Sequence, residues 1–147
     1  MTKAIYFDMD GTIADLYGSP DWLDNLEAER TKPYREAKAL VDMRNLGKTL
    51  NNLQKMGYHI GIISWLSKCG SNEYNARVTK TKLDWLKRHI SSVEWDEIKI
   101  VPYGSPKSKN VEFPDGILFD DEKRNRQEWP GMAFDVNNIL YILNCLR

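Results

Sequence analysis

Short apolar runs alternate with stretches of helical periodicity along the chain. The runs at residues 3–7, 59–63, 98–101, 116–119 and 132–134 have the length of buried strands. Helices are predicted at residues 21–29, 40–56, 74–90 and 137–146. Strands that alternate with helices are typical of βαβ units, so the pattern predicts an α/β fold with a parallel sheet.

The two longest predicted helices each carry one apolar stripe. Residues 31–34 are expected to interrupt the helical structure ahead of the predicted helix at residues 40–56. Gly57 is expected to end that helix. The stripe of the helix at residues 40–56 is formed by Leu40, Met43, Leu46, Leu50 and Leu53. The stripe of the helix at residues 74–90 is formed by Tyr74, Val78, Trp85, Leu86 and Ile90. Both stripes are predicted to face the core.

Two carboxylates follow the first apolar run. Asp8 and Asp10 stand one residue apart, and Gly11 after them allows a sharp turn. Like charges at this range repel, and a divalent cation with oxygen ligands relieves the repulsion. The alternative is a strand that ends in a solvated acidic turn.

A second acidic pair, Asp120 and Asp121, follows the run at 116–119. Ligands of open parallel sheets bind at the carboxyl ends of the strands, where both pairs are expected to lie. The two strand ends together predict a Mg²⁺ site with open positions for water and a phosphate oxygen.

Other strand ends supply candidate phosphate ligands. Ser64 and Trp65 follow the second run, and a hydroxyl with a backbone N–H can hold a phosphate oxygen. Ser64 as an ordinary helix N-cap is the alternative. Lys107 and Lys109 follow the run at 98–101 and can offset the negative charge. Lys107 is preferred because the turn before it can direct its side chain back over the strand ends.

In this order, these pieces resemble the motifs of the haloacid dehalogenase superfamily of phosphohydrolases, over residues 3–136. The segment 7–13 resembles the first motif, Asp-x-Asp-x-Thr/Val, and Ser64 and Lys107 match the second and third. Asp120 and Asp121 match the fourth, an acidic pair. Within the superfamily, residues 8–15 look most like the 5′(3′)-deoxyribonucleotidase branch, and residues 125–129 resemble it more loosely.

The resemblance implies a single domain, residues 1–147, with a three-layer Rossmann-like parallel sheet of strand order 3-2-1-4-5. It also implies a minimal cap insertion at about 17–35, or none; the deoxyribonucleotidase relatives usually carry a larger helical cap.

The resemblance also implies the chemistry. Asp8 would be the nucleophile that forms an aspartyl-phosphate, and Asp10 the general acid and base. Mg²⁺ would be held by the Asp8 carboxylate, the Asp10 carbonyl and the Asp120 carboxylate, with Asp121 supporting them.

The phosphoryl oxygens would be bound by Ser64, the Trp65 N–H and Lys107. The favoured substrate is a small phosphate ester, a nucleoside monophosphate. Aromatic side chains near the predicted rim could stack on a base or pack under the cap: Tyr17, Trp22, Tyr34, Trp65 and Tyr103. Alternatives are a sugar phosphate, a nucleic-acid 3′ end, or a non-catalytic phosphate-binding module like a receiver domain.

The composition of the chain narrows the classes of protein to which it could belong. The 147 residues hold 21 Lys and Arg against 21 Asp and Glu, so a duplex nucleic-acid partner is not expected. Cys69 and Cys145 form no metal-binding motif, and we expect reduced thiols in a cytoplasmic protein. No signal peptide or membrane-spanning run is recognised, and His59 and His89 are interpreted as structural.

Overall fold

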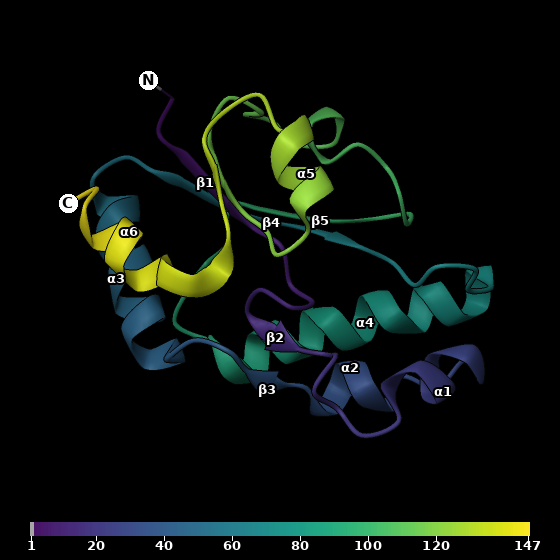
Figure 1. The fold of residues 1–147 in the computed structure, drawn as a ribbon. Coiled ribbons are helices and arrows are strands. Elements are labelled where there is room, and N and C mark those ends of the chain that lie inside the picture. The colour runs from purple at the N-terminus through teal and green to yellow at the C-terminus, as the bar shows by residue number, and fades with distance from the viewer. Residues whose placement is uncertain (1) are drawn as a thin grey trace.

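The computed structural model describes residues 2–147 and is built on a five-stranded parallel sheet (Figure 1). Its strands, in spatial order, are β5 (Glu97–Val101), β4 (His59–Trp65), β1 (Ala4–Phe7), β6 (Ile117–Phe119) and β7 (Ala133–Phe134). Numbered along the chain, this order is 3-2-1-4-5, so the predicted fold class is confirmed.

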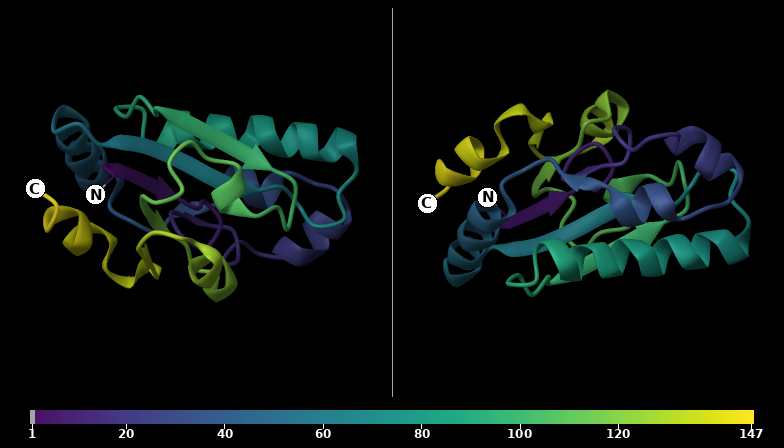
Figure 2. Two further views of the ribbon diagram at one scale, coloured as in Figure 1. Left: turned by 90° about the horizontal axis from the view of Figure 1, so that it is seen from above. Right: turned by 90° about the horizontal axis from the view of Figure 1, so that it is seen from below.

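Helices and loops cover both faces of the sheet (Figures 1 and 2). One face packs on α3 (Met43–Lys55), α4 (Asn72–His89) and α6 (Ile139–Asn144). The other lies under α5 (Lys123–Glu128) and the segment 102–116. Because the central strand is covered on both sides, all four residues of β1 are buried, as its continuous apolar run predicts.

An excursion between β1 and α3 packs against α4. The pairing of β2 (Ala14–Asp15) with β3 (Lys38–Ala39) closes its base, and it contains α1 (Trp22–Glu27) and α2 (Lys32–Glu36). Leu16 and Tyr34 of the excursion form a small core with Tyr74 and Val78 of α4. Residues 17–35, the predicted minimal cap, lie within this excursion.

Several predicted boundaries were wrong. Residues 31–34 do not interrupt helical structure: α2 begins there, because Pro33 stands in the first turn, where no N–H is needed. Leu40 is exposed and precedes α3, whose N-cap is Asp42. β4 continues through Ser64 and Trp65. Short 3₁₀ turns lie at η1 (Lys107–Lys109) and η2 (Val136–Asn138).

Candidate active site

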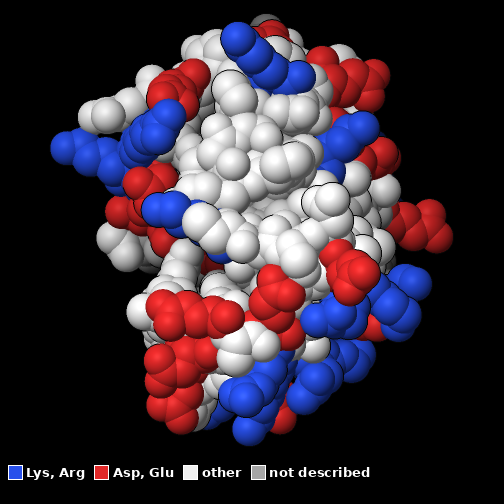
Figure 3. Space-filling model, turned by 90° about the vertical axis from the view of Figure 1, so that its right-hand side faces the viewer, with Lys and Arg blue, Asp and Glu red and all other residues white. Residues whose placement is uncertain are grey.

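The carboxyl ends of β1, β4 and β6 lie side by side at one edge of the sheet. The Asp8 N–H donates to the Phe119 carbonyl at 2.9 Å, which ties the end of β1 to the end of β6. A cavity of about 550 Å³ opens over this edge, and Asp8, Asp10 and Asp120 are among its lining residues. Figure 3 views the side where the strands end: a broad uncharged area lies above acidic side chains at the lower left and basic side chains at the lower right.

Lys107 joins the two acidic segments. Its Nζ lies 2.9 Å from Asp8 Oδ1 and 2.6 Å from Asp120 Oδ2, and only 5% of the residue is exposed. Burial acts to lower the pKa of Lys107, but the charges of Asp8 and Asp120 outweigh it and raise that pKa above its usual value. Lys109 is exposed, so the structure brings Lys107 and not Lys109 to the carboxylates.

Three carboxylates crowd together beside Lys107. One oxygen from each of Asp8, Asp120 and Asp121 lies within 4.8 Å of the others. Burial and the Asp8 charge raise the pKa of Asp120 to about 6, against the opposing effect of Lys107. The same two causes raise the pKa of Asp121 to about 8. Such a concentration of hard oxygen donors and negative charge fits a divalent cation. Asp121, predicted to support the metal ligands, thus lies in the same group of carboxylates as Asp8 and Asp120.

Neighbouring polar groups orient these carboxylates. Thr12 donates to Asp8 Oδ2 at 2.9 Å and accepts from the Asp121 N–H at 3.2 Å. The Asn125 amide donates to Asp120 Oδ2 at 3.2 Å. Gly11 has a φ of 80°, and a Cβ at this position would overlap the Asp121 carboxylate. Glycine therefore permits both the turn after β1 and the close approach of the two acidic segments.

Asp10 is not part of this group of three carboxylates and pairs with Lys82 of α4. Lys82 Nζ lies 2.8 Å from Asp10 Oδ2. Burial raises the pKa of Asp10, and the Lys82 charge opposes the rise. Sequence reasoning missed Lys82, although a signal was present: it follows Tyr74 and Val78 at intervals of four and precedes Leu86 by four, so a lysine occupies a position of the apolar stripe.

Ser64 and Trp65 have different surroundings at the end of β4. The Ser64 side chain is fully buried and accepts a hydrogen bond from Lys82 at 2.8 Å. Trp65 lines the cavity, and its indole N–H donates to the Ser105 carbonyl at 2.9 Å. The predicted contact of Ser64 with a phosphoryl oxygen thus stays a prediction, since Ser64 is not among the residues that line the cavity.

The aromatic side chains predicted for the rim all line the cavity. The Tyr17 and Trp22 rings meet edge to face at a centroid distance of 5.0 Å, and those of Trp65 and Tyr103 are tilted at 4.9 Å. Tyr34 completes the set. Tyr17 and Tyr103 are each 51% exposed, so these two rings offer accessible faces.

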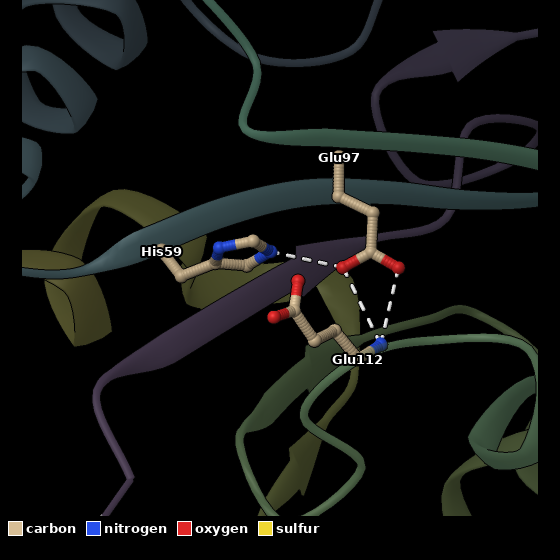
Figure 4. Close-up of side chains that lie close together, drawn as sticks. All are labelled: His59, Glu97 and Glu112. Carbon is tan, nitrogen blue, oxygen red and sulfur yellow. Dashed lines mark hydrogen bonds and ion pairs between the residues drawn. The ribbon is translucent and has the colours of Figure 1, made fainter.

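A second group of metal-ligand residue types lies away from this cavity, on the face of the sheet under residues 102–116 (Figure 4). His59 Nε2 lies 2.9 Å from Glu97 Oε1, and Tyr6 donates to the same oxygen at 2.7 Å. The other Glu97 oxygen accepts from the Glu112 N–H at 3.1 Å. Glu97 is satisfied by these contacts, which fasten the loop at Glu112 to the sheet.

The cysteines and His89 lie outside the candidate active site or carry no special contact in it. Cys69 and Cys145 are exposed and unbridged. The His89 ring stacks on Trp85 at a centroid distance of 4.2 Å. Within residues 2–147, no helix has both the length and the apolar character needed to cross a bilayer.

Comparison with known proteins defines the fold. No protein-family model matches the chain, and no curated protein is similar to it. Two solved structures match with a TM-score of 0.59 and 13% identity, over 99% of this chain and 98% of theirs. One is the D,D-heptose 1,7-bisphosphate phosphatase of B. bronchiseptica, complexed with magnesium and phosphate. The other is the D,D-heptose 1,7-bisphosphate phosphatase of Burkholderia thailandensis. The chain therefore shares the α/β fold of these two phosphatases. At 13% sequence identity, the similarity shows a shared fold and no more. Neither of these two structures is a nucleotidase.

Proposed function

We propose that the protein is a Mg²⁺-dependent phosphomonoesterase that acts through an aspartyl-phosphate. The observation that carries this proposal is the environment of Asp8. Lys107 and Thr12 hold its two oxygens, Asp120 and Asp121 crowd it, and it lines the cavity at the carboxyl edge of the sheet. The shared fold with known phosphatases supports the proposal.

The three crowded carboxylates suit Mg²⁺, which prefers oxygen ligands. We assign Asp8 and Asp120 as ligands, with the Asp10 carbonyl, and add Asp121 as a candidate. When bound, the ion would neutralise negative charge on the phosphoryl group and on the carboxylates.

Asp8 and Asp10 divide the chemical work. A bond forms between an Asp8 oxygen and phosphorus while the bond from phosphorus to the leaving oxygen breaks, and the Asp10 carboxyl gives that oxygen its proton. Asp10 then takes a proton from water as the water oxygen attacks phosphorus. Asp8 is released, and inorganic phosphate leaves. Lys107 and the Trp65 N–H would bind the phosphoryl oxygens during both steps.

We favour a nucleoside monophosphate as the substrate class. The wall of the cavity combines exposed aromatic faces at Tyr17 and Tyr103 with the carboxylates at its base. Stacking of a base on an aromatic ring contributes about 1–3 kcal/mol. A sugar phosphate is the second candidate, because the two matching structures are phosphatases of a sugar bisphosphate.

A phosphatase assay tests the function and the substrate class together. With Mg²⁺, the wild type should hydrolyse p-nitrophenyl phosphate, and EDTA or Asp8→Asn should abolish turnover. In a panel of nucleotides and sugar phosphates, a nucleoside monophosphate should give the highest kcat/KM. Tyr103→Ala should raise its KM about tenfold, in line with one lost stacking contact, and leave that of glycerol phosphate unchanged. Wild-type protein that binds phosphate without turnover would instead indicate a binding module.

A further inference from the structure

Lys82 is a buried cation at the edge of the candidate site. Only 1% of the residue is exposed, and a lysine is rarely buried to this degree unless its charge is paired. Its Nζ lies 2.8 Å from Asp10 Oδ2, 2.8 Å from Ser64 Oγ and 2.6 Å from the Trp65 carbonyl. An ammonium has three N–H donors, so all three are used within the protein.

This saturation excludes a direct role for Lys82 on substrate. No donor is left for a phosphoryl oxygen, and Lys82 is not among the residues that line the cavity. Lys107, by contrast, lines the cavity and contacts Asp8. The two buried lysines of the site therefore have different roles. Lys107 offsets the charge of Asp8 and Asp120, whereas Lys82 contacts groups of the protein alone.

The contact leaves one oxygen of Asp10 free. Oδ2 accepts from Lys82, whereas Oδ1 accepts no hydrogen bond from residues 2–147. Every buried side-chain N or O atom among those residues has a partner, so the free Oδ1 is not buried. Because 17% of the side chain is exposed and Asp10 lines the cavity, Oδ1 is the oxygen that can reach a ligand.

Lys82 also connects three segments that are distant in sequence. It joins the turn after β1, through Asp10, to the end of β4, through Ser64 and the Trp65 carbonyl. The Tyr34 ring of α2 lies over the ammonium, 5.1 Å from Nζ to the ring centroid. A single side chain of α4 thus links Asp10 to the end of β4 and to the excursion.

We propose that Lys82 is a positioning residue for the general acid: it holds Asp10 by Oδ2 so that Oδ1 faces the leaving oxygen of the substrate. The inference rests on the proposed phosphatase function and extends it to a residue that none of the sequence motifs includes. Precise placement of a proton donor matters because small displacements of a catalytic group lower the rate severely.

The leaving group provides the decisive readout. Wild type, Lys82→Met and Asp10→Asn are compared on p-nitrophenyl phosphate, whose leaving group needs little protonation, and on an alkyl phosphate, whose leaving group needs a proton. Lys82→Met should lower kcat at least tenfold on the alkyl phosphate, less than threefold on the aryl phosphate, and change KM less than twofold on either. Lys80→Met is the matched control, because Lys80 lies on the same helix with its side chain 79% exposed, and it should match the wild type.

A double variant distinguishes positioning from general damage. If Lys82 acts through Asp10, adding Lys82→Met to Asp10→Asn should cost no further activity on the alkyl phosphate. Additive losses, or equal losses on both substrates, would overturn the inference. If Lys82→Met does not fold, as judged by circular dichroism, Lys82→Gln, which stays polar but is uncharged and shorter than lysine, should show the same selective loss. An inactive wild type would refute the phosphatase function, whereas an active wild type with an unaffected Lys82→Met refutes only the positioning role.

Discussion

Replacing Lys107 with alanine tests the electrostatic design of the site independently of any substrate. Lys107 is the cation that contacts both Asp8 and Asp120, at 2.9 Å and 2.6 Å, and its side chain is only 3% exposed. The variant leaves two buried carboxylates without this partner. Asp121, whose pKa is already raised to about 8, stands beside them.

The size of the effect follows from burial. Removing one partner of a buried ion pair costs about 3–5 kcal/mol, because an uncompensated charge remains. In a domain of this length, each kcal/mol corresponds to about 2–4 °C in Tm, so Lys107→Ala should lower Tm by roughly 6–20 °C in EDTA. Mg²⁺ should restore part of the loss, since a bound cation offsets the same carboxylates.

Thermal and urea unfolding at pH 8, in EDTA and in Mg²⁺, measure the effect. Lys109→Ala is the matched control: Lys109 lies two residues away and is exposed, so its loss should change stability by less than about 0.5 kcal/mol. If the two variants unfold alike in EDTA, the Lys107 contacts are not what stabilises the site. With Mg²⁺ and a phosphate ester, Lys107→Ala should also lower kcat/KM at least tenfold, as the loss of a charge-assisted contact of about 1.5–3 kcal/mol implies.

Two further predictions concern the same cluster. Gly11→Ala should be less stable than Gly104→Ala by about 1–3 kcal/mol in urea unfolding, because both glycines have a left-handed φ but only a Cβ at Gly11 meets a carboxylate; equal losses would argue against the close approach of Asp121. In EDTA, Tm should fall as pH rises from 6 to 8.5. The folded-state pKa values of Asp120 and Asp121, about 6 and about 8, lie above that of an unfolded aspartate at about 3.9, so the folded state holds protons that it must lose over this range. Asp121→Asn should flatten the decline and Mg²⁺ should reverse it, whereas a rise in Tm in EDTA would contradict the reasoning.

The strands and their acidic ends were predictable because their signals are local. A fully covered parallel strand needs a continuous apolar run, as in β1, and the chemistry of its ligand edge follows directly in sequence. The residue pattern is therefore enough to assign Asp8 and Asp120 to the carboxyl ends of strands, whereas their place on neighbouring strands came from the family resemblance. The boundaries of α2 and α3 were harder to predict from the sequence. Proline usually breaks a helix, yet Pro33 fits the first turn of α2.

The α/β class and the acidic residues of the site follow from the residue pattern, and the strand order follows from a family resemblance. Which basic side chains join these acidic residues depends on how distant segments pack together. Lys107 and Lys109 differ by two residues of a short turn, and its backbone path decides which one reaches Asp8. Lys82 stands 72 residues from Asp10 and meets it only because α4 packs across the end of β4. Periodicity records which face of a helix is buried, but the partner of a buried charge depends on the other segment that lies there.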